Sequence, residues 1–231
     1  MKLIQQRQKL QISPTVLEEE SGRSTWQKHG GLLPKSIRGA ICGPSGCGKT
    51  CVMVNLLYHP DGLRFANIYL FCKTLEQPKY KELEAVVNSN PGMSCIGSSD
   101  AMIPLADIKE NSILIFDDVA TESQIPIRNA YCTGRHRGID CFYLTQTYTS
   151  IPKHLLRDNL NLIVLFKQDL ANMRHVFEDH VAGDMNFSTF QKMCAKAWDT
   201  AYSFLVIAKD NPLNLGRYRR NFDQFFEDIN S

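Results

Sequence analysis

The sequence lacks any apolar run long enough to cross a membrane. Its longest runs, such as LIVLF and FLVIA, have the length of a strand, whereas a membrane helix needs roughly 20 apolar residues. The first residues, MKLIQQRQKLQ, also lack the apolar core of a secretory signal peptide. We therefore expect a soluble intracellular protein with no membrane span.

The sequence also lacks an excess of charge of one sign, and it lacks paired cysteines. Its 26 Lys and Arg residues against 24 Asp and Glu residues give a net charge of +2. Composition alone therefore does not indicate nucleic-acid binding, and any contact with DNA must come from local placement of charge. The 8 cysteines form no CxxC pair and mostly fall in apolar runs, which favours reduced core thiols over zinc ligands or disulfides.

A regular alternation of strand-length and helix-length segments runs through the chain. Short runs rich in Ile, Leu, Val, Phe and Tyr predict buried parallel strands, and they lie at 37–43, 67–73, 112–118, 141–146 and 162–168. Helix-length stretches lie between and after them, at 49–58, 78–89, 125–133, 151–159, 171–181 and 188–199. Another strand, of unassigned direction, is predicted at 202–210. This order predicts an α/β fold with a mainly parallel central sheet, flanked by helices and joined by right-handed crossovers.

The length of the chain, 231 residues, suits a single α/β domain with short extensions. We assign residues 37–210 to this domain. Residues 1–36 are mostly polar and predict an N-terminal extension or strap, in which Trp26 is the side chain expected to pack. Residues 211–231 mix basic, aromatic and acidic side chains and are expected to form a C-terminal tail.

The stretch GPSGCGKT, at 43–50, fits the Walker A pattern G-x-x-x-x-G-K-[ST]. It follows a predicted strand and opens a predicted helix, where backbone N–H groups and a helix N-terminus converge on phosphates. A glycine-rich turn without a ligand is the less favoured interpretation. We expect Lys49 to reach the β- and γ-phosphates of ATP and Thr50 to hold Mg²⁺. The predicted nucleotide-binding residues are Gly43, Pro44, Ser45, Gly46, Cys47, Gly48, Lys49 and Thr50.

The stretch SILIFDD, at 112–118, has the form of a Walker B strand. It places Asp117 at the carboxyl end of a predicted strand, where α/β sheets bind ligands and where a carboxylate would meet Mg²⁺. Asp118 then stands where many additional-strand ATPases carry a Glu that polarises the attacking water. We favour this catalytic role for Asp118; the alternative is an N-cap for the following helix.

Two other classes of P-loop protein are disfavoured. A GTPase would carry Asn or Thr where Phe166 begins FKQD, and DDVA at 117–120 lacks the glycine of the second switch motif. A small-molecule kinase would need an arginine-bearing lid. TGRHRG at 133–138 contains arginines, but a predicted strand follows it at once and leaves no room for a closing flap.

The strand at 141–146 follows the Walker B strand and ends in Thr-Gln, as an additional strand inserted between the Walker A and Walker B strands would. Gln146 would then point its amide at the γ-phosphate or the attacking water, unless it is a polar strand end bound by a loop. Arg135 and Arg137 precede this strand, at its N-terminal end. This edge of the sheet lies away from the nucleotide of the same chain, so these arginines are better placed to reach the site of a neighbouring molecule. Either could stabilise charge at a neighbour's site, Arg137 being slightly preferred, or both could belong to a solvated basic turn. Arg157 is an interface or sensor residue or a helix cap.

Together these segments resemble the FtsK/HerA superfamily of DNA-pumping ATPases. They are most similar to the poxvirus-type genome-packaging ATPases of large DNA viruses, virophages and Polinton-like elements. The most specific part of the resemblance is GRHRGIDCFYLTQTYTSIPKHLLRDNLNLIVLF, and the similar region covers about 37–170. The pair of Asp117 and Asp118, in place of Asp-Glu, also resembles this viral branch.

The resemblance implies a P-loop fold of the additional-strand, RecA-like class and a homo-oligomeric ring that hydrolyses ATP at its subunit interfaces. It further implies translocation of double-stranded DNA into a preformed capsid, with a capsid vertex or portal protein as partner. Such a protein would work at the site of virion assembly in the host cytoplasm or nucleus, or in the virion. Two alternatives stay open: another additional-strand ATPase, such as a helicase loader or DNA-transfer pump, and a nucleotide-gated binding protein with little turnover.

Sequence-independent contacts with DNA would come from a few Lys and Arg side chains repeated around a ring. Two basic clusters are candidates, and either could equally be ordinary surface. The aromatic segment FDQFF, at 222–226, either packs on the core or docks a capsid partner. The residues of the two basic clusters are Lys73, Lys79, Lys81, Arg217, Arg219 and Arg220.

Overall fold

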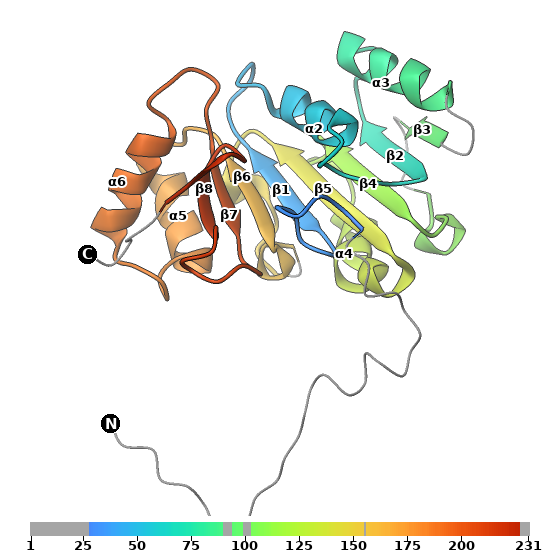
Figure 1. The fold of residues 1–231 in the computed structure, drawn as a ribbon. Coiled ribbons are helices and arrows are strands. Elements are labelled where there is room, and N and C mark those ends of the chain that lie inside the picture. Colours follow the sequence, from blue (N-terminus) through green and yellow to red (C-terminus); the bar gives the residue numbers. More distant parts are fainter. Residues whose placement is uncertain (1–27, 90–93, 99–102, 155, 227–231) are drawn as a thin grey trace, which may run out of the picture.

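A single mixed sheet runs through the part of the chain that the computed structural model describes, residues 28–89, 94–98, 103–154 and 156–226 (Figure 1). Its strand order is β3-β2-β4-β5-β1-β6-β7-β8-β9. The six strands from β3 to β6 are parallel, and β7, β8 and β9 are antiparallel to their neighbours. The predicted α/β fold with a mainly parallel sheet is therefore confirmed. Trp26 lies outside the described residues.

The five predicted parallel strands all form, and their side chains are almost entirely buried because helices cover both faces of the sheet. They are β1 (Arg38–Cys42), β2 (Asn67–Cys72), β4 (Ser112–Asp117), β5 (Ile139–Thr145) and β6 (Leu162–Leu165). Strand β7 (Leu205–Ala208) supplies the predicted strand of unassigned direction and runs antiparallel to β6.

The strand order confirms the insertion expected from the Thr-Gln strand. Strand β5 lies between β1 and β4 and pairs in parallel with both. In this register Cys42 is level with Thr145, and Asp117 is level with Leu144. The carboxyl ends of the three strands that carry the site therefore lie at the same height on one edge of the sheet.

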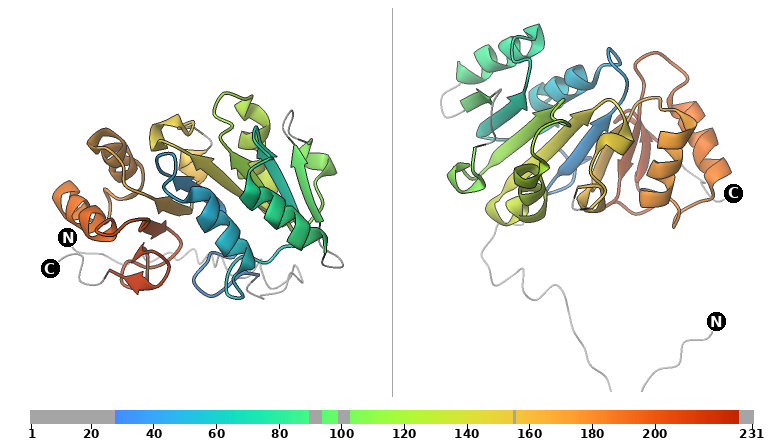
Figure 2. Two further views of the ribbon diagram at one scale, coloured as in Figure 1. Left: turned by 90° about the horizontal axis from the view of Figure 1, so that it is seen from above. Right: turned by 180° about the vertical axis from the view of Figure 1, so that it is seen from behind.

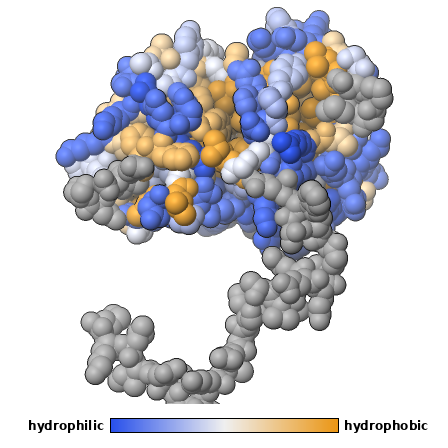
Figure 3. Space-filling model, viewed as in Figure 1, coloured by the Kyte–Doolittle hydropathy of each residue, from blue (hydrophilic) through white to orange (hydrophobic). Residues whose placement is uncertain are grey.

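The helices divide into two layers, one on each face of the sheet (Figure 2). Helices α2 (Lys49–Tyr58) and α3 (Pro78–Asn88) pack on one face, and their buried side chains share a core with alternate residues of the strands. Helices α4 (Gln124–Thr133), α5 (Leu170–His180) and α6 (Phe187–Ala197) pack on the other. On the face seen in Figure 3, hydrophobic residues gather toward the centre and hydrophilic ones surround them.

The prediction of a helix at 151–159 is wrong. Among the described residues of this stretch only a short 3₁₀ turn forms, at Arg157–Asn159. The guanidinium of Arg157 donates from Nε to the Ile151 carbonyl at 2.6 Å and from Nη2 to the Thr149 carbonyl at 3.0 Å. These two carbonyl groups thus bond a side chain in place of a helical N–H group. Pro152, the residue after Ile151, has no N–H group to donate, so the chain takes an irregular path here.

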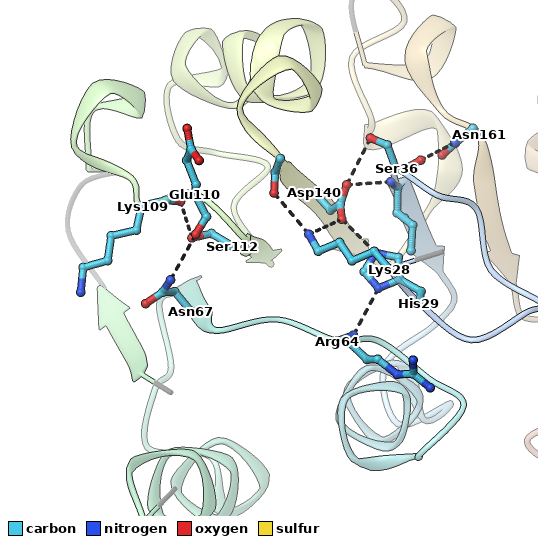
Figure 4. A network of polar contacts seen from close by, with 12 residues as sticks. Lys28, His29, Ser36, Arg64, Asn67, Lys109, Glu110, Ser112, Asp140 and Asn161 are labelled. Atoms are coloured by element: carbon cyan, nitrogen blue, oxygen red, sulfur yellow. Dashed lines mark hydrogen bonds and ion pairs between the residues drawn. The ribbon is translucent and has the colours of Figure 1, made fainter. Parts of the chain in front are cut away.

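Residues 28–36 lie against the sheet and end at β1. The buried carboxylate of Asp140, in β5, holds them there. It accepts hydrogen bonds from Lys28 at 3.1 Å, His29 at 3.0 Å, Ser36 at 3.2 Å and the Ile37 amide at 2.9 Å (Figure 4). Burial alone would raise the pKa of Asp140, but the His29 bond and the Lys28 charge outweigh it and leave that pKa below its ordinary value. This segment therefore behaves as a strap.

Two short strands continue the sheet within the segment that the sequence treats as a tail. Strand β8 (Tyr218–Arg220) pairs with β7, and β9 (Gln224–Phe225) pairs with β8. Phe222 and Phe226 of the FDQFF segment pack against the core, whereas Phe225 is exposed. Strand β3 (Ser94–Ser98) extends the opposite edge and was not predicted. In the described ranges no helix is long and apolar enough to span a bilayer.

Candidate nucleotide-binding site

At two positions of the loop between β1 and α2, only glycine fits the backbone conformation and the space available. A Cβ on Gly43 would lie 2.6 Å from both the Cβ of Phe166 and the sulfur of Cys47, so a side chain has no room there. Gly48, the residue before α2, has a φ of 106°, in the left-handed region that other residues rarely adopt. The backbone path of this loop therefore requires the glycines of the Walker A pattern.

Helix α2 begins at Lys49 and has no acidic residue in its first turn, so its N-terminus is suited to an anion. The ammonium of Lys49 lies across the loop and donates to the carbonyl oxygens of Gly43 at 2.8 Å and Pro44 at 3.0 Å. A lysine at the start of a helix that follows a glycine-rich loop is the arrangement that the Walker A pattern predicts for phosphate binding.

A cavity of about 410 Å³ opens beside this loop, at the carboxyl ends of β1, β4 and β5. It brings together most of the residues that were predicted from separate motifs. Another part of its wall comes from the connection between β2 and α3 and from the start of α3, and it includes Thr74, Gln77 and Lys79, which the sequence did not assign to the site. The predicted site residues in its lining are Ser45, Gly46, Gly48, Lys49, Thr50, Asp117, Asp118 and Gln146.

Asp117 is buried at the end of β4, and its partner was not predicted. The hydroxyl of Tyr80, a buried residue of α3, donates a hydrogen bond to Oδ2 of Asp117. Burial raises the pKa of Asp117, while the bond from Tyr80 and the charge of Lys49 oppose that rise. Tyr80 thus fixes one carboxylate oxygen of Asp117, and the other is not engaged by this bond.

Asp118 is exposed, and its backbone has a φ of 55°, which is uncommon for a residue with a side chain. The N-cap alternative is wrong, because α4 begins at Gln124 and its N-cap position is Ser123. The unusual backbone turns Asp118 out of the strand direction, and its side chain lines the cavity near Gln146. Both residues therefore line the same cavity as Lys49 and Thr50.

Arg135 and Arg137 lie in a 3₁₀ turn before β5, at the opposite edge of the sheet from the cavity. The Arg137 guanidinium donates to the carbonyl oxygens of Leu105, Ala106 and Ile108, the last two at 3.2 and 3.1 Å. Arg135 is exposed. The structure therefore bonds Arg137, the slightly preferred of the two, within its own chain and leaves Arg135 exposed.

Arg157 is buried and holds the loop that follows Gln146. Besides its bonds to loop carbonyls, it donates to Asp179 at 3.3 Å and lies over the ring of Tyr148, 4.9 Å from its centre. Tyr148 contacts Asp179 at 2.9 Å and His180 at 2.7 Å. The structure therefore gives Arg157 contacts within its own chain, at the loop after Gln146.

Comparison with known proteins gives matches among solved structures alone, since no protein-family model and no curated protein matches the chain. The genome packaging NTPase B204 from Sulfolobus turreted icosahedral virus 2, in complex with sulfate, has a TM-score of 0.56 at 15% identity, covering 77% of this chain and 94% of that chain. This chain shares its fold.

Two further structures agree with this result. The same NTPase, B204 from Sulfolobus turreted icosahedral virus 2, in complex with AMPPCP has a TM-score of 0.54 at 15% identity, over 77% of this chain and 95% of that chain. The DNA-packaging ATPase B204 from Sulfolobus Turreted Icosahedral Virus has a TM-score of 0.50 at 15% identity, over 74% and 92%. At such identities the likeness concerns the fold: an α/β sheet of mainly parallel strands flanked by helices, as in these P-loop ATPases.

The basic clusters considered for DNA contact are largely paired within the chain. The prediction is wrong for Arg219, which is 1% exposed and donates to the Gly216 and Leu32 carbonyls. The other five basic side chains all have an acidic neighbour. These pairs are Arg217 with Asp184, Arg220 with Asp199, Lys73 with Glu122, Lys79 with Glu82, and Lys81 with Glu76.

Proposed function

We propose that this chain is an ATPase that moves double-stranded DNA and packages a viral genome into a preformed capsid. One observation carries the proposal: Lys49, Thr50, Asp117, Asp118 and Gln146 line a single cavity at the carboxyl ends of β1, β4 and β5. The shared fold with viral packaging NTPases supports it, as does the motif resemblance to poxvirus-type packaging ATPases.

In this proposal the loop at 43–50 binds the phosphates of ATP through its backbone N–H groups and Lys49. The hydroxyl of Thr50 and the carboxylate of Asp117 would hold Mg²⁺, and hard oxygen donors of this kind suit that ion. Tyr80 keeps the carboxylate in one orientation. When bound, Mg²⁺ supplies positive charge that offsets the negative charge developing on the transferred phosphoryl group.

Asp118 and Gln146 act on the water. Gln146 orients it toward the γ-phosphorus, and Asp118 accepts a proton as the new oxygen–phosphorus bond forms and the bond to the β–γ bridging oxygen breaks. ADP and phosphate are the products. Removal of a general base lowers such a rate by about 10²–10⁴-fold.

The hydrolysis would be completed by a second subunit. In a homo-oligomeric ring, Arg135 from the far edge of one sheet would reach the γ-phosphate of the neighbour's nucleotide, so that only assembled subunits turn over rapidly. Duplex DNA would pass through the ring without sequence preference, held by phosphate contacts, and a capsid vertex or portal protein would anchor the ring at the site of virion assembly.

Steady-state ATP hydrolysis with and without long duplex DNA tests this function, with Lys49→Ala as the blank. We expect hydrolysis that depends on Lys49 and that duplex DNA stimulates at low salt, where phosphate contacts are strongest. Hydrolysis indifferent to DNA would support a different additional-strand ATPase. Tight nucleotide binding without hydrolysis would support a nucleotide-gated binding protein.

A further inference from the structure

A second cavity, of about 320 Å³, lies on the other side of the same loop. The two cavities share the loop as a common wall: Ser45, Gly46 and Gly48 line the first, whereas Pro44 and Cys47 line the second. The first cavity adjoins β4 and β5, and the second adjoins β6 and the turn that precedes β7. The rest of its lining includes three aromatic side chains, Phe166, Trp198 and Tyr202.

The orientation of a bound nucleotide follows from which residues lie in the first cavity. Asp118 and Gln146, which act at the γ-phosphate, both lie on the β4 and β5 side of the loop. The nucleoside is at the opposite end of the phosphate chain, and the second cavity offers it a place on the β6 side of the loop. We propose that the second cavity binds the nucleobase of the nucleotide and that Tyr202 stacks on it. This inference rests on the proposed nucleotide-binding function.

The exposure, position and backbone conformation of Tyr202 suit a residue that binds a ligand. Tyr202 is 73% exposed, although it stands beside the loop, and its Cδ1 would lie 3.9 Å from a Cβ built on Gly48. Its φ is 63°, a left-handed conformation that is strained for an aromatic residue. Strained backbone of this kind concentrates at functional sites, where the surrounding structure maintains it.

The turn that carries Tyr202 is held on both sides. Arg220 donates to Asp199 at 2.5 Å and to Thr200 at 2.9 Å, and Ser203 donates to the Thr200 carbonyl at 2.7 Å. The indole of Trp198 donates to the Leu165 carbonyl of β6 at 2.8 Å. The ring of Tyr202 is therefore presented by a fixed turn, so little conformational freedom would be lost when a base stacks on it.

The chemistry of the lining suits a flat aromatic ligand. Pro44 and Phe166 give the cavity apolar surface, and the exposed ring of Tyr202 offers a π-face. Every nucleobase has a π-face, so stacking on an aromatic side chain contributes to affinity whatever the base. The occupant to which we commit is the base of a nucleoside triphosphate, and a subunit contact at the same aromatic residue is the competing outcome.

Binding of two ligands, ATP and inorganic tripolyphosphate, separates the base from the phosphates. Each is titrated calorimetrically with Mg²⁺ into the wild-type chain, Tyr202→Gly and Tyr202→Phe. Glycine removes the ring and also relieves the positive φ, so this variant should fold. We expect Tyr202→Gly to weaken ATP binding by about tenfold, an effect typical of losing one stacked aromatic, and to leave tripolyphosphate binding unchanged. Tyr202→Phe keeps the affinity for ATP.

Tyr58→Ala is the matched control, because Tyr58 is a 40% exposed tyrosine at the far end of α2. It should bind both ligands as the wild-type chain does. Equal losses of both ligands in Tyr202→Gly would show that Tyr202 acts on the phosphate site, and no loss of either would show that it does not contact the nucleotide. Both results would overturn the base site, whereas binding of both ligands by the wild-type chain would still support the phosphate site. A shift of oligomeric state without a change in ATP affinity would assign Tyr202 to a subunit contact and also overturn it. A wild-type chain that binds neither ligand would contradict the proposed function itself.

Discussion

The hydroxyl of Tyr80 on α3 donates a hydrogen bond to the carboxylate of Asp117 at the end of β4. The bond joins two buried residues that are 37 positions apart in the sequence. It connects the helix on one face of the sheet to the carboxylate expected to hold Mg²⁺. The orientation of that carboxylate is therefore set by a side chain outside the Walker motifs.

Tyr80→Phe removes only this hydroxyl. Because Asp117 then loses its fixed orientation, we expect the Mg²⁺ concentration for half-maximal ATP hydrolysis to rise several-fold, with a loss of stability of about 1 kcal/mol for one buried hydrogen bond. Magnesium titrations of hydrolysis, together with urea unfolding, measure both effects. Tyr69→Phe is a control from the neighbouring strand β2. An unchanged Mg²⁺ requirement in Tyr80→Phe would show that Tyr80 serves packing alone.

Asp118→Asn preserves the size of the side chain and is tolerated at a positive φ, since Asn enters the left-handed region more readily than most residues. We expect ATP hydrolysis to fall by about 10²-fold or more because the proton acceptor is lost. Nucleotide affinity should change by less than about threefold, because the loop and Lys49 supply that binding. Near-normal hydrolysis by this variant would remove Asp118 from the mechanism and favour a structural role.

Arg135→Ala and Arg137→Ala should have different effects. Removal of the Arg137 guanidinium leaves the carbonyl oxygens of residues 105, 106 and 108 without their donors, so its own subunit should lose roughly 2–3 kcal/mol in urea unfolding. Arg135 is exposed, and its removal should cost less than about 0.5 kcal/mol. In mixtures with active subunits, Arg135→Ala should nevertheless depress hydrolysis more than in proportion to its share. Proportional loss would contradict a role for Arg135 in trans.

His180 makes stability depend on pH. Burial and the nearby Lys209 lower its pKa from 6.5 to about 3. Lys209 lies 3.2 Å from Nδ1, so neutral His180 carries its proton on Nε2 and donates it to Tyr148, which donates in turn to Asp179. The folded chain keeps this neutral form, whereas the unfolded chain takes up a proton below about pH 6.5.

The free energy of unfolding should therefore fall as the pH drops from 6.5 toward 3. One proton changes it by at most about 1.4 kcal/mol per pH unit. Urea unfolding at several pH values in this range measures the slope of the unfolding free energy against pH. His180→Gln should reduce this slope by nearly the amount that corresponds to the uptake of one proton on unfolding. His175→Gln, in the same helix but exposed, is the control and should leave the slope unchanged. Equal slopes for the wild-type chain and His180→Gln would mean that His180 titrates normally in the folded state.

The sequence predicted the parts of the fold that rest on local pattern. Continuous apolar runs marked the five buried parallel strands, and Thr-Gln after the Walker B strand was enough to predict that β5 lies between β1 and β4. Strand β3 was missed because it is short, partly exposed and contains Gly97. The stretch 151–159 failed because the side chain of Arg157 bonds the carbonyls of its own loop, which no periodicity reveals.

The Walker loop, Asp117, Asp118 and Gln146 could be found in the same way, since strand ends carry them to one edge of the sheet. Tyr80 and Tyr202 could not. Tyr80 reaches the site from the buried side of a helix, so its pattern is that of an ordinary core residue. Tyr202 is distinguished by a positive φ and a position beside Gly48, and both depend on the assembled structure. The bonds that distinguish Arg137 from Arg135 are tertiary as well.

Displacement of a third strand from duplex DNA tests ATP-driven translocation most directly. A triplex-forming oligonucleotide is placed at one end of a linear duplex, and its release is followed after addition of the purified chain with ATP. A translocase releases the oligonucleotide with ATP but not with a non-hydrolysable analogue, and Lys49→Ala releases none. Vigorous ATP hydrolysis on the same duplex without release of the third strand would contradict translocation.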